Sequence, residues 1–416
     1  MNKIVSLSVI ALLMGTSSAF AAGYHVNEYS TTSVGRALAG VGMVADDYSA
    51  LGYNPAGMSF NEKSGMQAGA TYVGVRSTVA GTVNYTANPV TGQTPYTRTG
   101  TSSPYIARVL PEVFAQYKLN DQWTWGAGFY VPYGLATDYK NTWFGNAHAL
   151  RSEIRAIDYS TGFSYRPIDE ISLAVALNVQ HASATLTNKV ERGGMYLGDM
   201  MQANLEGEDW GVGYTLGAAF EPVKGTRFGV SYRSKISHDL RGHMDFDGAN
   251  RQDVHAKITT PEVVTISGYQ KVGKQLGLSA TARWTRWSRF NTLNINRRAD
   301  GATLSKTVEH WENQWFFALG ADYQVIDGLT FRVGTAYDQA AVQDPQYRTA
   351  RIPDARRIWT SVGASYAYKN WQFDAGYAHL FIKAATAEHG SEGSSDFHAK
   401  YASEANIVSA NIQYKF

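Results

Sequence analysis

The chain has 416 residues, no cysteine, and 37 lysines and arginines against 35 aspartates and glutamates, which gives a net charge of +2. Without cysteine there is no disulfide framework, no thiol nucleophile and no Cys-ligated metal. The near-neutral charge argues against a nucleic-acid binder, because such proteins need a basic surface. Only 17% of the residues are charged, while glycine (40) and tyrosine (26) are abundant, a composition that suits long β-strands facing a medium less polar than water.

The first residues have the pattern of a secretory signal. Lys3 precedes an apolar run at residues 4–14, and small residues follow up to Ala19-Phe20-Ala21. A charged start, a short apolar core and an A-x-A site are the three parts of a signal peptide. The run is too short to cross a bilayer as a helix. We therefore expect residues 1–21 to be a signal peptide and the mature chain to begin at Ala22.

Residues 22–63 show no regular alternation of apolar and polar side chains. The segment is small, polar and rich in turn residues, among them Gly35, Gly40, Gly42, Asn54 and Pro55. It is long enough to fold inside a barrel made by the rest of the chain. We expect it to form an N-terminal hatch, or plug, with residues 64–416 forming the barrel.

From about residue 65 the sequence alternates between apolar and polar positions. Ile157, Tyr159 and Phe163 share one face of a predicted strand, while Asp158 and Ser160 share the other. Side chains of a strand point alternately to its two faces, so each such segment has one apolar and one polar or small face. The same pattern recurs at residues 171–180, 212–220, 228–235, 315–323, 329–337 and 408–416.

The connections between these segments differ at the two ends. Short turns such as Lys224-Gly225 and Asp327-Gly328 lie at one end, and long connections are expected at the other. The long connections fall at residues 188–208, 240–253, 290–309, 339–356 and 385–402. The asymmetry, an even count of about fourteen strands, and Tyr and Trp near the segment ends are typical of outer-membrane barrels.

The predicted fold is all-β, a transmembrane antiparallel β-barrel of about 14 strands with the hatch inside its lumen. The sheet must close, because an open edge would leave backbone groups unpaired in lipid. A soluble β-sandwich or propeller is the alternative. The aromatic residues at segment ends and the terminal strand that closes with Phe416 favour the barrel.

Pro132 interrupts one of the predicted strands. It lies between Trp123 and Asp138, close to Gly126, Gly128 and Gly134. Proline cannot donate to the ladder and glycine marks bulges, so pairing should break near Pro132 and Gly134. An ordinary bulge at the barrel rim is the other interpretation.

The predicted loop at 188–208 is rich in apolar residues. Part of it has helical spacing, so a short amphipathic helix and a groove for lipid are one interpretation, and packing on the barrel rim is the other. The groove candidates are Met195, Leu197, Met200, Met201 and Leu205.

Several short motifs, in the same order along the chain, resemble the FadL-type long-chain fatty acid transporters (OMPP1/FadL/TodX). They include Gly35-Arg36-Ala37, Ala45-Asp46-Asp47, Asn54-Pro55-Ala56, Tyr133-Gly134-Leu135 and Ile352-Pro353-Asp354 with Arg357. The resemblance implies a fourteen-stranded barrel with an N-terminal hatch, in the outer membrane of a Gram-negative bacterium. It also implies passage of hydrophobic molecules, either long-chain fatty acids or aromatic hydrocarbons.

The resemblance assigns roles to particular residues. Arg357, which the alternation points into the lumen, matches the family's arginine after Pro-Asp and would bind a carboxylate, although Arg356 stands where the family has an aspartate. Arg192 resembles a second basic position. The family's side opening would lie at Pro132 and Gly134, gated by Asn54, Pro55 and Ala56. Alternatively, the lumen arginines simply pair with acids of the hatch or wall.

No enzyme is expected. The chain has no G-x-S-x-G, H-E-x-x-H or P-loop motif, and we expect no cofactor and no metal. The predicted function is passive, gated transport of a long-chain fatty acid or another hydrophobic small molecule. A non-specific porin, an aromatic-hydrocarbon channel, or an adhesin or phage receptor using the long loops are the alternatives. The expected surroundings are outer-membrane lipid and lipopolysaccharide, and the expected state is a monomer.

Overall fold

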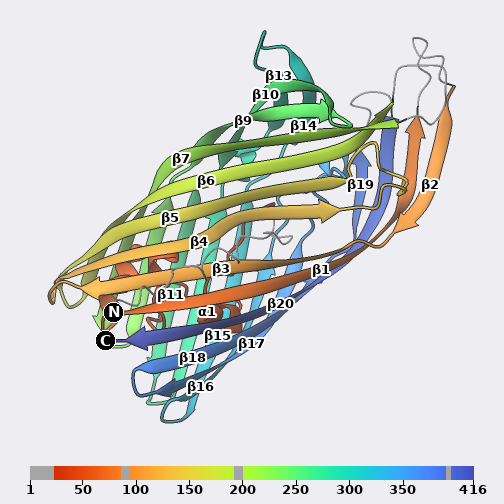
Figure 1. Cartoon of the computed structure of the whole chain (residues 1–416). Coiled ribbons are helices and arrows are strands. Elements are labelled where there is room, and N and C mark those ends of the chain that lie inside the picture. The colour runs from red at the N-terminus through yellow and green to blue at the C-terminus, as the bar shows by residue number, and fades with distance from the viewer. Residues whose placement is uncertain (1–22, 86–93, 192–199, 390–394) are drawn as a thin grey trace, which may run out of the picture.

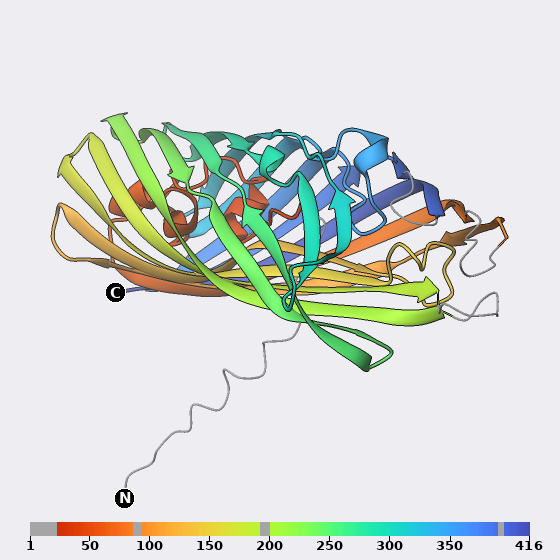
Figure 2. The same cartoon turned by 90° about the horizontal axis from the view of Figure 1, so that it is seen from above.

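The computed structural model describes residues 23–85, 94–191, 200–389 and 395–416. They form a closed antiparallel barrel of 14 strands around a short helical segment (Figures 1 and 2). The ring runs β1, β3, β4, β5, β6, β7, β8, β11, β12, β15, β16, β17, β18 and β20. It closes where β20 pairs with β1 along their whole lengths. The predicted fold class is confirmed.

The bounds of the elements follow. The helices are α1 (Thr31–Gly35), α2 (Ala50–Tyr53), η2 (Pro55–Phe60), η3 (Trp287–Arg289) and η4 (Pro345–Tyr347). The first ten strands are β1 (Gly65–Tyr85), β2 (Tyr96–Ser102), β3 (Tyr105–Lys118), β4 (Trp123–Asp138), β5 (Arg151–Ile168), β6 (Ile171–Glu191), β7 (Met200–Val223), β8 (Thr226–Arg233), β9 (Ile236–Phe246) and β10 (Ala249–Thr260). The others are β11 (Val263–Val272), β12 (Leu276–Thr285), β13 (Thr292–Arg297), β14 (Thr303–Val308), β15 (Gln314–Ile326), β16 (Leu329–Asp338), β17 (Arg357–Tyr368), β18 (Trp371–Ile382), β19 (Ala385–His389) and β20 (Ser395–Lys415).

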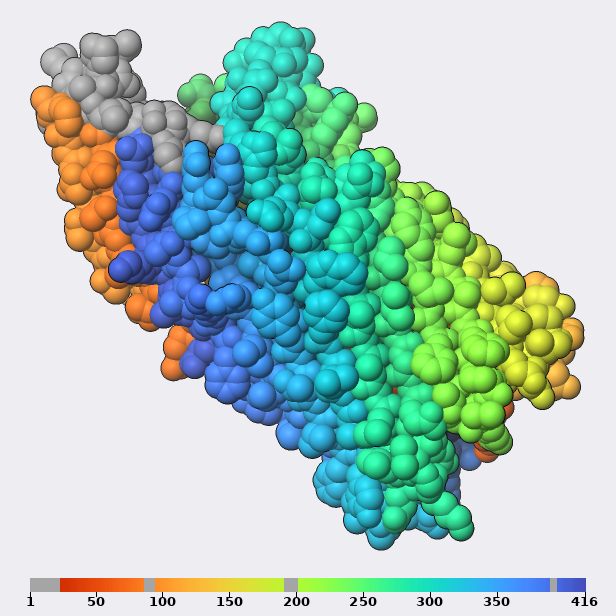
Figure 3. Space-filling view, turned by 180° about the vertical axis from the view of Figure 1, so that it is seen from behind, coloured from red at the N-terminus to blue at the C-terminus, as the bar shows by residue number. Residues whose placement is uncertain are grey.

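The outer face of the barrel is apolar and its inner face is polar. On β6 the outward side chains of Leu173, Val175 and Leu177 are 50%, 51% and 47% exposed, whereas Ser172 and Asn178 are buried. This is the reverse of a water-soluble protein, and it matches strands whose outer face meets lipid. The wall is continuous when the barrel is seen from behind (Figure 3).

The turns at one end are short, as the sequence predicts. Two residues join β7 to β8 and two join β15 to β16, and in each turn the glycine, Gly225 or Gly328, has a positive φ. At the other end the connections between ring strands are long, as predicted, but three of them contain strands instead of irregular loops. Residues 240–253, 290–309 and 385–402 lie largely in strand hairpins that continue the wall, among them β9–β10 and β13–β14 at the top of Figure 1. Their polar side chains obscured the alternation.

Residues 23–63 lie inside the barrel, as Figure 2 shows for the helices near the N-terminus. Nearly all of their side chains are buried. Arg36 donates to Asp46 at 2.7 Å within the segment and to Asp322 of β15 at 2.9 Å, and Arg332 of β16 also contacts Asp46 at 2.9 Å. These buried ion pairs fasten the segment, called the hatch below, to the wall. No helix in the described part of the chain is long and apolar enough to span a membrane.

Candidate functional site

The pairing of β4 breaks near Pro132. β3 and β4 are paired only from Val113 opposite Phe129 to Lys118 opposite Thr124. The register between β4 and β5 shifts between Tyr130 and Tyr133. Beyond this point β4 leaves β3, because Pro132 has no N–H to offer the ladder.

Beyond the break, β3 and β4 are no longer paired with each other. Residues 105–112 of β3 pair with β1 but have no partner on β4 among the described residues, and residues 130–138 of β4 pair only with β5 and the hatch. We call the space between these two stretches the side gap. Every residue of β4 from Tyr130 to Thr137 is buried, so both faces of this stretch are covered.

The hatch occupies the free edge of β4 at the side gap. The Val26 N–H donates to the Pro132 carbonyl at 2.9 Å, and the Gly134 N–H donates to the Tyr24 carbonyl at 2.8 Å. His25 stacks on Tyr133 with ring centroids 4.9 Å apart. The first described residues of the hatch therefore replace β3 as the partner of β4.

Asn54, Pro55 and Ala56 lie elsewhere. The Asn54 side-chain amide donates to the carbonyls of Ala218 on β7 and Val230 on β8, at 3.3 and 3.2 Å. The prediction that this triplet faces the break at Pro132 is therefore wrong. The physical reason is local. Asn54 accepts from the Ala56 N–H and starts η2, whereas an extended segment such as 24–26 can pair with a strand edge.

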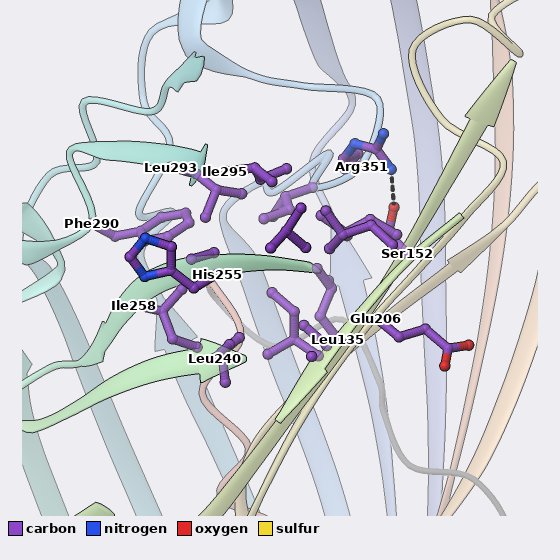
Figure 4. Close-up of a pocket in the computed structure, with 18 of the residues that line it drawn as sticks. Leu135, Ser152, Glu206, Leu240, His255, Ile258, Phe290, Leu293, Ile295 and Arg351 are labelled. Atoms are coloured by element: carbon purple, nitrogen blue, oxygen red, sulfur yellow. Dashed lines mark hydrogen bonds between the residues drawn. The ribbon is translucent and has the colours of Figure 1, made fainter. Parts of the chain in front are cut away.

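An apolar pocket lies in the lumen next to β4. Its walls include Leu135, Ile154, Leu240, Ile258, Phe290 and Leu293, and we call it the lumen pocket (Figure 4). Its cavity volume is about 40 Å³. Leu135 of β4 and Ile154 of β5 place the pocket on the inner side of the side gap.

Arg351, in the connection between β16 and β17, stands at the rim of the lumen pocket (Figure 4). Its guanidinium donates to the Ser152 hydroxyl at 3.1 Å, the Thr187 carbonyl at 3.3 Å and the Asn188 side-chain oxygen at 2.9 Å. Within the described ranges no carboxylate lies at ion-pair distance from it. Burial lowers the pKa of Arg351 to about 10, so it still carries its charge at neutral pH.

Arg357 also points inward, but its charge is balanced. It contacts Asp354 at 2.6 Å and Asp338 at 3.5 Å, and its side chain is 2% exposed. This is the arrangement of the alternative interpretation, in which lumen arginines pair with acids of the wall.

The predicted helix in the loop at 188–208 is wrong where the chain is described. Met200, Met201 and Leu205 belong to β7, which pairs with β6 as far as Glu191 opposite Met200. The four-residue spacing of Leu197, Met201 and Leu205 fits a helix but equally fits one face of a strand, whose period is two. Leu205 lines the lumen pocket. Arg192, Met195 and Leu197 lie outside the described residues, as does the predicted signal peptide.

Sequence reasoning did not single out Arg351. No motif marks it, and the neighbouring Arg357 fits the family pattern instead. The available signal was weak: Arg351 is an arginine in a predicted long connection, with no acid within two residues on either side.

Comparison with known proteins agrees with the barrel and its hatch. A family model described as outer membrane protein transport protein (OMPP1/FadL/TodX) matches residues 12–416. The long-chain fatty acid transport protein of Salmonella typhi is 27% identical, covering 99% of this chain and 98% of that protein. The 47 kDa outer membrane protein of Pasteurella multocida is 30% identical, with the same coverage.

Solved structures share the fold. The crystal structure of a Pseudomonas aeruginosa FadL homologue has a TM-score of 0.86 and 24% identity, covering 95% of this chain and 100% of that one. A crystal structure of the Pseudomonas putida toluene transporter TodX has a TM-score of 0.67 and 16% identity, covering 94% and 99%. The chain is therefore an outer-membrane protein of the OMPP1/FadL/TodX family, whose members are transport channels and not enzymes.

Proposed function

We propose that this protein carries long-chain fatty acids passively across the outer membrane. In this proposal the apolar tail occupies the lumen pocket, the carboxylate binds Arg351, and the acid leaves through the side gap into the lipid. The observation that carries the proposal is the position of Arg351 beside an apolar pocket, with only neutral hydrogen-bond partners among the described residues.

The chemistry of the site matches the chemistry of a fatty acid. Such a molecule needs an apolar space for its chain and a cation for its head group. A buried guanidinium whose hydrogen-bond partners are neutral can still bind a carboxylate directly, and the bonds between them are charge-assisted. Arg357 is the useful contrast, since Asp338 and Asp354 already satisfy its charge.

A second candidate substrate is a monoaromatic hydrocarbon. The lumen pocket is apolar, and structures that share the fold include toluene transporters of Pseudomonas putida and Ralstonia pickettii. A hydrocarbon has no charge to place on Arg351, however. The relatives from Salmonella typhi and Escherichia coli, whose names specify long-chain fatty acids, cover nearly the whole chain.

The position of the hatch across the barrel axis supports the proposed release through the wall. The hatch fills the lumen and is held by the ion pairs of Arg36 and Arg332. The lumen pocket borders β4 on the inner side of the break at Pro132. A lateral step is therefore the shorter path to an apolar medium. Residues 24–26, which cover the free edge of β4, are the gate in this proposal.

Arg351→Gln tests the assignment of the carboxylate site. We expect palmitate binding to the purified protein in mild detergent to weaken about tenfold or more, because a hydrogen bond to a charged group contributes roughly 1.5–3 kcal/mol. Toluene binding should not change. Arg298→Gln is the matched control, since Arg298 is exposed on the β13–β14 hairpin. Calorimetry on the three proteins measures both ligands.

Two results would count against the proposal. Palmitate binding that is unchanged in Arg351→Gln would remove the carboxylate site. Tight binding of toluene together with no measurable binding of palmitate by the unmodified protein would favour the hydrocarbon channel instead.

A further inference from the structure

The outward side chains of β17 and β18 change from apolar to cationic at the end of the barrel away from the short turns. Ile358 and Phe381 lie opposite each other and are 50% and 56% exposed. Beyond them the backbone pairing continues, because the Lys383 N–H donates to the Arg356 carbonyl at 2.9 Å. Arg356 and Lys383 are both exposed and lie two residues from Ile358 and Phe381, so they continue the same outward face. We call Arg356 and Lys383 the outer pair.

The outer pair places two positive charges opposite each other on neighbouring strands. In the part of the chain that the structure describes, neither side chain makes an ion pair or a hydrogen bond. Like charges that stand directly opposite each other on a sheet are destabilising. An acid of the same chain could remove this repulsion, so the positions of the nearby acids decide whether the pair is balanced.

The nearby acids are engaged elsewhere or lie too far away. Asp338 and Asp354 are buried, and both contact Arg357 on the lumen side of the wall. Glu404 of β20 is outward and stands opposite Phe381, one step nearer the middle of the wall than Lys383. Among the described residues it is not at ion-pair distance from either member of the outer pair. Both cations are therefore available to an anion from outside the chain.

The outer pair lies where the apolar wall ends. Tyr337 of β16 is exposed and stands opposite Ile358, so an apolar row of Tyr337, Ile358 and Phe381 runs just below the two cations. Aromatic residues of outer-membrane barrels gather where the membrane meets water, and the short turns of such barrels face the periplasm. The outer pair is therefore at the extracellular interface, at the level of the head groups of the outer leaflet.

We propose that the outer pair binds a phosphate group of lipopolysaccharide, the phosphorylated glycolipid of the outer leaflet. A guanidinium donates two parallel hydrogen bonds to a phosphate, and an ammonium adds a compact charge. The acyl chains of the same molecule pack on Ile358 and Phe381, and the phosphate removes the repulsion between the two cations. The inference uses only the position of the barrel in the outer membrane and does not depend on which substrate is transported.

Binding of lipid A with and without its phosphates tests the inference. Native mass spectrometry of the purified protein in mild detergent measures the dissociation constant of each lipid. The double variant Arg356→Gln with Lys383→Gln should bind bisphosphorylated lipid A about tenfold more weakly, because charge-assisted bonds to the phosphate are lost. Dephosphorylated lipid A should bind weakly, and equally to the unmodified protein and the double variant.

Controls separate a phosphate site from a general effect of charge. Lys224→Gln with Lys271→Gln removes two exposed positive charges at the short-turn end and should leave the binding of lipid A unchanged. Arg356→Lys keeps both charges of the outer pair and should keep most of the affinity. A shift in gel mobility on heating shows whether each variant is a folded barrel.

Phosphatidylglycerol distinguishes the two sources of a lipid phosphate. We expect it to bind more weakly than lipid A, which presents two phosphates and more acyl chains. Equal affinities for phosphatidylglycerol and bisphosphorylated lipid A would overturn the assignment to lipopolysaccharide. Unchanged binding of lipid A by the double variant of the outer pair, or an equal loss in the lysine control, would overturn the phosphate site itself.

Discussion

The charged side chains inside the barrel differ in how their charges are balanced. Arg36 and Arg357 each contact two carboxylates, and Arg233 contacts Asp158 at 2.6 Å. Buried charges of this kind hold parts of a structure together because removal of one partner leaves the other uncompensated. Arg351 has neutral partners instead. The buried Arg283 and Arg348 also have no ion pair among the described residues, so what distinguishes Arg351, which we assign to the ligand, is its place at the rim of the lumen pocket.

Glu28 of the hatch should make stability depend on pH. Burial raises the pKa of Glu28 from its usual 4.5 to about 7. Between these two values the unfolded chain gives up its proton while the folded chain keeps it, so stability falls as the pH rises through this window. Above pH 7 this loss of stability is complete. A pKa shift of this size corresponds to a destabilisation of roughly 3 kcal/mol.

Thermal unfolding in detergent at pH 5, 6, 7 and 8 checks this expectation. Glu28→Gln cannot ionise and should therefore have a flatter dependence on pH than the unmodified protein. Identical dependence in the two proteins would show that Glu28 does not carry the effect.

β4 is the element on which the proposed route depends. Its sequence predicts a break at Pro132, and the structure has a shift in register at that position. The sequence does not indicate what pairs with the freed edge, because the partner, residues 24–26, lies about a hundred residues away. The Val26 N–H reaches the Pro132 carbonyl only after the hatch has folded into the lumen.

Pro132→Ala tests the role of this break. Alanine supplies the missing N–H and allows regular pairing, so we expect β4 to move toward β3, the side gap to narrow and palmitate uptake by cells to fall several-fold. Pro222→Ala is the control, because Pro222 lies at the turn end of β7. Normal uptake with Pro132→Ala would contradict lateral release at this position.

At the scale of the whole molecule, the barrel forms the wall of the channel and the hatch obstructs its lumen. A fourteen-stranded ring is wider than side chains alone can fill, since eight-stranded barrels are already just filled. The hatch occupies that space with buried helices that contact β16, β17 and β18. A plugged transporter and a non-specific porin therefore differ in what the hatch does to the flow of ions.

Deletion of residues 22–63, with the signal segment retained, should convert a poorly conducting protein into an open channel in planar bilayers. The physical reason is that the wall closes on itself without the hatch, through the pairing of β1 with β20. The shift in gel mobility on heating verifies that the shortened barrel is folded. Equal conductance before and after the deletion would favour the porin.

The sequence by itself determined the closed barrel, its two faces and the position of the hatch. It could do so because strand period, turn residues and the unalternating leading segment are local properties of the chain. It also predicted the break at Pro132 for a local reason, the missing N–H. Only the tertiary structure decided which arginine lies at the lumen pocket with neutral hydrogen-bond partners, and which hatch residues cover β4. Those outcomes depend on distances between residues far apart in the chain, such as Arg36 and Asp322 at a separation of 286 residues, and no local pattern encodes them.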